Sequence, residues 1–248
     1  MEFLAISWLE IALAIIVVIA GTVIQSAVGF GLALIAAPVL LLIDRNLVPG
    51  PLIAAALFQV IWMGWNERHS INFGYFKAAL AGRLIGSPPA AYLMGTISAM
   101  VFDLLFASLV LIAVGISLAH TNIRPSSTKV FVATIFSGFM STISSIGGPP
   151  VALVFQNASG SELRGNLAML FTMGCIVSLI ALAAVGRFQL EDLVYSALLI
   201  LGVIIGVLCS GPFKRQIDRH SARPWLLGLC SLSALTVILR AVFLAGMD

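Results

Sequence analysis

Long runs of apolar residues, separated by short polar loops, form the main pattern along the chain. Most runs are close to the ~20 residues with which an α-helix crosses the hydrocarbon core of a bilayer. The pattern therefore predicts an all-α integral membrane protein with about eight apolar segments. These segments are residues 3–43, 48–65, 76–94, 100–119, 130–155, 166–185, 193–210 and 224–244.

Two of the runs are interrupted by residues that break helices. As one helix, the run 3–43 would be about 60 Å long, twice the thickness of the hydrocarbon core. It is interrupted by the Gly-Phe-Gly sequence at residues 29–31, and the run 130–155 is interrupted by the Gly-Gly-Pro-Pro sequence at residues 147–150. Glycine adopts backbone angles that end helices, and proline suits a first helical turn. We expect two helical hairpins, each either re-entrant or crossing the membrane twice.

Composition and charge agree with a membrane protein and suggest its orientation. Of the 248 residues 60% are hydrophobic and 9% are charged, whereas soluble domains carry roughly a quarter charged residues. If each interrupted run is a hairpin, most Lys and Arg residues fall in loops on one side, around residues 66–77, 120–129, 157–165 and 211–223. The positive-inside rule then makes these loops cytoplasmic and predicts that both termini are extracytoplasmic.

The two halves of the chain resemble each other. Each half begins with an interrupted run and later carries a small-xxx-small pair, Gly82/Gly86 in one and Gly202/Gly206 in the other. Because the halves start on opposite sides of the membrane, the sequence predicts two inverted-topology repeats, the plan of many secondary transporters. The expected parts are a first membrane repeat, a cytoplasmic linker and a second membrane repeat, at residues 1–120, 121–129 and 130–248.

Polar residues near the two interruptions suggest a binding site for an anion at mid-membrane. Freed backbone groups cost several kcal/mol each in lipid, so such breaks survive only inside protein or beside a watery cavity. A short helix that starts there would direct the partial positive charge of its N-terminus into the membrane. The candidate substrate-binding residues are Gln25, Ser26, Gly29, Phe30, Gly31, Arg83, Ser141, Thr142, Ser144, Ser145, Gly147 and Gly148.

These residues also have structural interpretations, which the sequence leaves open. Arg83 offers a fork of donors to an anion, or it extends its charged end to the lipid headgroups. Serine and threonine hydroxyls in membrane helices often bond to their own helix or to a neighbouring one.

The sequence carries no motif of an enzyme, a metal site or a cofactor site. There is no HExxH, GxSxG or Walker sequence, and no acid–base pair is expected inside the membrane. Cys175, Cys209 and Cys230 lie in apolar runs, and we expect them to be packing residues away from both interruptions. We therefore predict a protein that is not an enzyme and needs no cofactor.

The glycine and proline pattern resembles that of the sulfite exporter TauE/SafE family over nearly the whole chain. The similar residues are Gly21, Gly29, Phe30, Gly31 and Pro38 in the first half, and Gly138, the sequence 145–150 and the sequence 202–206 in the second. The resemblance implies a multi-pass protein of the bacterial inner membrane. It also implies a secondary transporter that exports sulfite, sulfoacetate or other organosulfonates by alternating access. The Gly-Phe-Gly sequence departs from the denser glycine cluster that is common in the family.

The expected partners are a small anionic substrate and the lipid bilayer, with no role for nucleic acid. The energy source is open: an ion gradient, with a proton or sodium as the coupling ion, the membrane gradient, or the gradient of the substrate itself. The oligomeric state is open, a homodimer included. Two alternative functions also stay open: a passive anion channel, and a scaffold or accessory subunit that transports nothing.

Overall fold

The computed structural model describes residues 7–118, 123–158 and 160–213, which form helices joined by short connections. The α-helices are α1 (Trp8–Val28), α2 (Leu32–Ile43), α3 (Gly50–Asn66), α4 (Phe76–Thr96), α5 (Ala99–Leu118), α6 (Ser127–Ser144), α7 (Gly148–Val154), α8 (Gly160–Ala184) and α9 (Asp192–Phe213). Short 3₁₀ turns lie at Arg45–Leu47, Arg68–Ser70 and Phe73–Tyr75.

Five segments within these ranges have the length and composition of a membrane-crossing helix, which agrees with the predicted all-α membrane class. They are Trp8–Val28, Arg45–Asn66, Ala99–Leu118, Gly160–Ala184 and Asp192–Gly211. The apolar run expected at residues 224–244 lies outside the described residues.

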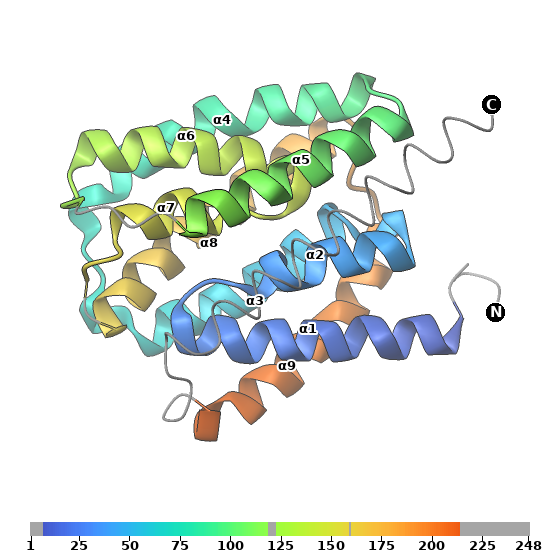
Figure 1. The fold of residues 1–248 in the computed structure, drawn as a ribbon, viewed down its shortest axis with the longest axis horizontal. Coiled ribbons are helices and arrows are strands. Elements are labelled where there is room, and N and C mark those ends of the chain that lie inside the picture. Colours follow the sequence, from blue (N-terminus) through green and yellow to red (C-terminus); the bar gives the residue numbers. More distant parts are fainter. Residues whose placement is uncertain (1–6, 119–122, 159, 214–248) are drawn as a thin grey trace.

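The first interrupted run folds into a hairpin of α1 and α2. Gly29 and Gly31 have φ angles of 99° and 136°, in the region that glycine occupies without strain. We call residues 29–31 the first turn. After it, α2 runs back beside α1 (Figure 1), and Leu32 packs on Gly21. The predicted break of the helix at this position is confirmed.

The second interrupted run forms a similar hairpin of α6 and α7. Here α6 ends at Ser144, Ser145 adopts a φ of 63°, and α7 begins at Gly148, with the two prolines in its first turn. We call residues 145–147 the second turn. The hydroxyl of Ser137 donates to the carbonyl of Gly147, which holds the start of α7 against α6. The predicted break is again confirmed.

Each small-xxx-small glycine pair brings one helix onto the first helix of the hairpin in the other half. α4 packs on α6, and α9 packs on α1. Between these pairs, α3 and α8 contact each other; α3 also contacts α9, and α8 also contacts α4. The glycines of α4 and α9 lie against matching backbone carbonyls: Gly82 and Gly86 against Phe131 and Ile135, and Gly202 and Gly206 against Ile15 and Ile19. In sequence, Phe131 and Ile135 precede the second turn by the same numbers of residues as Ile15 and Ile19 precede the first turn.

The connecting segments fall at two ends of the bundle (Figure 1). One end, which we call the basic end, holds residues 66–75, 123–126 and 155–158. Arg68, Lys77, Arg124, Lys129 and Arg164 lie in or next to these segments. The opposite end holds residues 44–49 and 185–191 and the α4–α5 connection. The described parts of the loops expected to be cytoplasmic therefore share one end.

Candidate functional site

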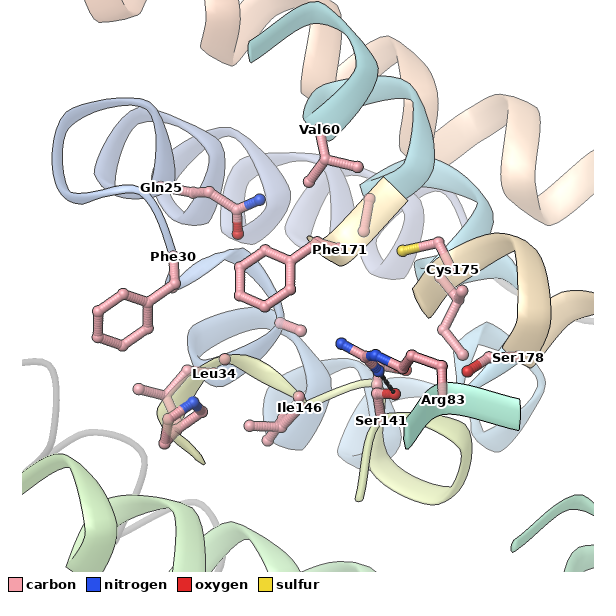
Figure 2. A pocket seen from close by; sticks show the side chains of 18 residues that line it. Gln25, Phe30, Leu34, Val60, Arg83, Ser141, Ile146, Phe171, Cys175 and Ser178 are labelled. Atoms are coloured by element: carbon pink, nitrogen blue, oxygen red, sulfur yellow. Dashed lines mark hydrogen bonds between the residues drawn. The ribbon is translucent and has the colours of Figure 1, made fainter. Parts of the chain in front are cut away.

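Both turns border one cavity of about 50 Å³. Its walls come from the first hairpin, the second hairpin and helices α3, α4 and α8 (Figure 2). The ring of Phe30 in the first turn lies over Gly148 at the start of α7, so the two hairpins contact each other beside the cavity. Segments far apart in the sequence thus build a single site.

Arg83 of α4 provides the charge in this cavity. The residue is only 1% exposed, and Figure 2 shows its guanidinium pointing into the cavity. Nη1 donates to the Ser141 hydroxyl at 2.8 Å, while Nε is buried without a hydrogen-bond partner. On α8, Gly174 makes the space for the guanidinium, because a Cβ there would lie 2.7 Å from both Nε and Nη1.

The guanidinium of Arg83 has no acidic partner within the described residues. The ion pairs found there join Arg45 to Asp103 and Arg164 to Glu67. A buried charge without a counterion is strongly unfavourable, and inside a membrane protein such a residue usually faces a substrate or ion path. The structure rules out the headgroup interpretation, since the guanidinium is enclosed between α6 and α8 and does not reach the lipid surface.

Other polar groups converge on the same space. The side-chain oxygen of Gln25 accepts the N–H of Leu32 at 2.9 Å, and Gln25 lines the cavity. Ser145 lines the cavity and donates to the carbonyl of Pro49 at 3.1 Å. The predicted site residues that line the cavity are Gln25, Phe30, Gly31, Arg83, Ser141, Ser145, Gly147 and Gly148.

Four of the predicted residues, Ser26, Gly29, Thr142 and Ser144, lie outside the cavity. Ser144 donates to the carbonyl of Met140 at 2.8 Å and Thr142 to that of Gly138 at 2.9 Å, so these hydroxyls bond to their own helix. Gly29 lies against Arg164 and Leu167 of α8. Residues adjacent in sequence point to different faces of a helix, which explains why neighbours of the lining residues do not all line the cavity.

Sequence reasoning missed the contribution of α8. Phe171, Cys175 and Ser178 line the cavity, and the expectation that the cysteines lie away from both interruptions is wrong for Cys175. The hydroxyl of Ser178 is 2.8 Å from that of Thr142. Gly174 and Ser178 are themselves a small-xxx-small pair, a signal that could have identified this face of α8.

A second and larger cavity, of about 380 Å³, lies at the end of the bundle opposite the basic end. Arg45, Arg187 and Asp192 are among the polar residues that line it. Pro49 also lines it, and the carbonyl of this proline accepts the hydroxyl of Ser145 from the first cavity. Ser145 and Pro49 therefore connect the linings of the two cavities.

These features define a multi-pass α-helical membrane protein with a cavity between two helical hairpins that is lined by a buried arginine. The chain belongs to the sulfite exporter TauE/SafE family, whose model matches residues 13–237. This is a family of transporters rather than enzymes, and membership implies the export of sulfite or a related sulfur-containing anion across a membrane. Comparisons with curated proteins and with solved structures gave no match.

Proposed function

We propose that the protein is a secondary transporter that exports a small sulfur oxyanion through the cavity around Arg83. The observation that carries this proposal is the buried guanidinium, which has no counterion in the part of the chain that the structure describes. A guanidinium presents planar, paired donors that match the oxygens of sulfite or a sulfonate. A bound oxyanion would supply the negative charge and the acceptor that the described residues do not provide.

Neutral donors around Arg83 would complete the binding of the anion. The amide nitrogen of Gln25 comes from the first hairpin, the hydroxyl of Ser141 from the second, and that of Ser178 from α8. The two hydroxyls would turn to the anion from their present acceptors, the carbonyl of Gly138 for Ser141 and the hydroxyl of Thr142 for Ser178. Hydrogen bonds to a charged group contribute about 1.5–3 kcal/mol each, more than those between neutral groups. Because the donors come from both hairpins, binding the anion would link the two halves of the protein.

The size of the cavity favours a small substrate. A buried water needs ~10–15 Å³ of such volume, so a cavity of about 50 Å³ accommodates a group of about four heavy atoms. Sulfite, with one sulfur and three oxygens, is of this size. Sulfoacetate and other organosulfonates carry the same headgroup with an organic tail, and they would require the cavity to widen.

The matched glycine contacts support an inverted-repeat transporter that works by alternating access. In this proposal the protein lies in the inner membrane of a bacterium, and its basic end faces the cytoplasm. The first turn is covered by Arg164, which pairs with Glu67 at 2.7 Å. The second turn is covered by Pro49 through Ser145. The two covers come from the starts of α8 and α3, so opening each in turn would expose the cavity to opposite sides.

Ligand-induced stabilisation of the purified protein tests the site. A ligand that binds the folded state raises the apparent melting temperature. We expect sulfite to do so for the wild type and for Arg187→Gln, a control that removes an exposed arginine, but not for Arg83→Gln. Without an anion, Arg83→Gln should be at least as stable as the wild type, because it removes an unpaired buried charge. An unchanged sulfite response in Arg83→Gln would contradict the proposed site.

Counterflow in proteoliposomes separates a carrier from a passive channel. With unlabelled sulfite inside, a carrier exchanges it for labelled sulfite and accumulates label transiently, whereas a channel only equilibrates. We expect accumulation in the wild type and none in Arg83→Gln. A protein that serves only as a scaffold would show neither exchange nor equilibration.

A further inference from the structure

A cluster of neutral oxygen atoms lies behind the cavity, between α1, α3 and α9. Thr22 and Gln59 are 0% exposed and Ser26 is 1% exposed. The amide nitrogen of Gln59 donates to the carbonyl of Thr22 at 3.0 Å and lies 3.5 Å from the hydroxyl of Ser26. Gly206 of α9 packs against the Cβ of Thr22 and closes the third side.

Two oxygens of this cluster, Thr22 Oγ1 and Gln59 Oε1, are buried without a hydrogen-bond partner in the described structure. Thr22 is unusual in this respect, since Thr134, Thr142 and Thr172 each donate to the carbonyl four residues earlier in their helix. An unsatisfied buried polar group costs about 1–3 kcal/mol. Two such groups on facing helices therefore point to a missing ligand.

We propose that this cluster binds a sodium ion, with Thr22, Ser26 and Gln59 as side-chain ligands. Hard cations select oxygen ligands, and Ca²⁺ and Mg²⁺ are normally bound through carboxylates, none of which belongs to this cluster. Neutral oxygens thus favour a monovalent cation. Ser26 lies in the last turn of α1, where the helix dipole places partial negative charge. Helix ends of this kind coordinate sodium in transporters with broken helices.

The position of the cluster supports a cation on other grounds. Under the proposed repeat, Thr22 corresponds to Gly138, because Thr22 precedes the first turn by the same number of residues as Gly138 precedes the second. In the second half, Arg83 passes over Gly138 and fills that place with its own charged side chain. At the first hairpin the residue that corresponds to Arg83, counted from the matched glycine pairs, is Val203, so this position supplies no positive charge beside Thr22. The positive charge beside Gly138 would then be a fixed one, the Arg83 side chain, and the positive charge beside Thr22 would be an exchangeable sodium ion.

The cluster is also linked directly to the cavity. Ser26 follows Gln25, and Gln59 precedes Val60, and both Gln25 and Val60 line the cavity. Gln25 in turn accepts the N–H of Leu32 across the first turn. A cation that orders the end of α1 would therefore order one wall of the anion site. This coupling rests on the proposed function, while binding of the cation itself does not.

Thermal unfolding of purified protein in sodium chloride, potassium chloride or choline chloride at equal concentration tests the inference. With chloride constant, we expect a saturable rise in apparent melting temperature of several degrees in sodium alone. Thr22→Val should abolish this rise, and in choline chloride it should melt at or above the wild type because it removes an unsatisfied hydroxyl. Thr134→Val, whose hydroxyl already has a partner, should respond to sodium as the wild type does.

Binding of radioactive sodium to the same proteins gives an independent measurement, and Ser26→Ala provides a second variant. Equal melting temperatures in the three salts, with no bound sodium, would show that the oxygens hold only water and would overturn the inference. An equal response to potassium would also overturn it, because it would mean a general salt effect.

The anion proposal can fail separately. Arg83→Gln should lose the response to sulfite and keep the response to sodium. If both sites are correct, sodium should increase the sulfite affinity of the wild type about fivefold or more, a typical coupling between sites. Thr22→Val should remove that increase. Sodium binding without any sulfite response would retain the cation site and reject the proposed function.

Discussion

Replacing Gly174 by alanine moves the proposed anion-binding group without removing it. The new methyl group would lie 2.7 Å from Nε and Nη1 of Arg83, whereas non-bonded heavy atoms prefer separations of about 3.5–4.0 Å. The guanidinium must therefore move by about 1 Å. Gly174 is in the middle of α8, where alanine suits the helix better than glycine, so the backbone itself offers no reason for a loss.

The expected loss of affinity follows from the hydrogen bonds of the guanidinium. Its bond to Ser141 is 2.8 Å long, and a shift of about 1 Å away from α8 would disturb the geometry of this bond and the position at which the guanidinium meets the anion. Misplacing one charged hydrogen bond to the anion costs about 1.5–3 kcal/mol. This corresponds to a loss of about ten- to hundredfold in sulfite affinity, together with a smaller cavity.

Calorimetric titration with sulfite, combined with a double-mutant cycle, measures this effect. We expect Gly174→Ala to weaken binding in the wild-type background and to have little further effect in Arg83→Gln, because the methyl group acts through the arginine. Gly115→Ala is the control, since a Cβ at Gly115 meets no atom within 4 Å. Wild-type affinity in Gly174→Ala would refute the reasoning, as would equal losses in both backgrounds.

Three further predictions concern packing, an ion pair and orientation. Gly86→Ala should destabilise the folded protein by about 1–3 kcal/mol or more, because its Cβ would clash with a carbonyl of α6; chemical denaturation checks this, and unchanged stability would mean that α4 packs less closely. Glu67 and Arg164 are partly buried, and a double-mutant cycle on them should give a coupling of about 1 kcal/mol in the free energy of unfolding. Additive effects of the two substitutions would show that the ion pair does not help to close the basic end. In a variant without native cysteines, a cysteine at His69 should react with an impermeant thiol reagent only from the cytoplasm and one at Gln189 only from outside; the reverse result would invert the proposed orientation.

The sequence was sufficient to predict the helical class and both turns. The patterns that identify the turns are local: two glycines at residues 29–31, and the Gly-Gly-Pro-Pro sequence, which both ends a helix and begins another. The sequence did not indicate that Ser145, rather than Gly147, adopts the left-handed conformation. In the folded chain the Ser145 hydroxyl donates to the carbonyl of Pro49, from a distant part of the chain, and this contact is not visible in the local sequence.

The composition of the cavity depended on tertiary packing, and for this reason only part of it was predictable. Arg83 is visible in the sequence as a charge within an apolar run, but its burial follows from Gly174, which lies on another helix. Cys175 and Ser178 reach the cavity only because α8 packs on α3 and α4. A site formed by four or more helices does not produce a fixed spacing of residues within any one segment of the chain. The sequence pattern therefore does not reveal which residues of the uninterrupted helices line the cavity.

Charge balance links the two proposed sites and gives a final prediction. Arg83 alone neutralises a monovalent sulfonate, but it leaves one negative charge buried when the ligand is the sulfite dianion. A sodium ion beside Thr22 and Gln59 would supply the second positive charge, and buried charges are stable only when they are compensated. Sodium should therefore increase the affinity for sulfite, at a pH where it is a dianion, more than that for methanesulfonate. Titrations of both anions in sodium and in choline chloride measure this difference. An equal effect on the two affinities would show that the cation acts on the shape of the cavity and not on its charge.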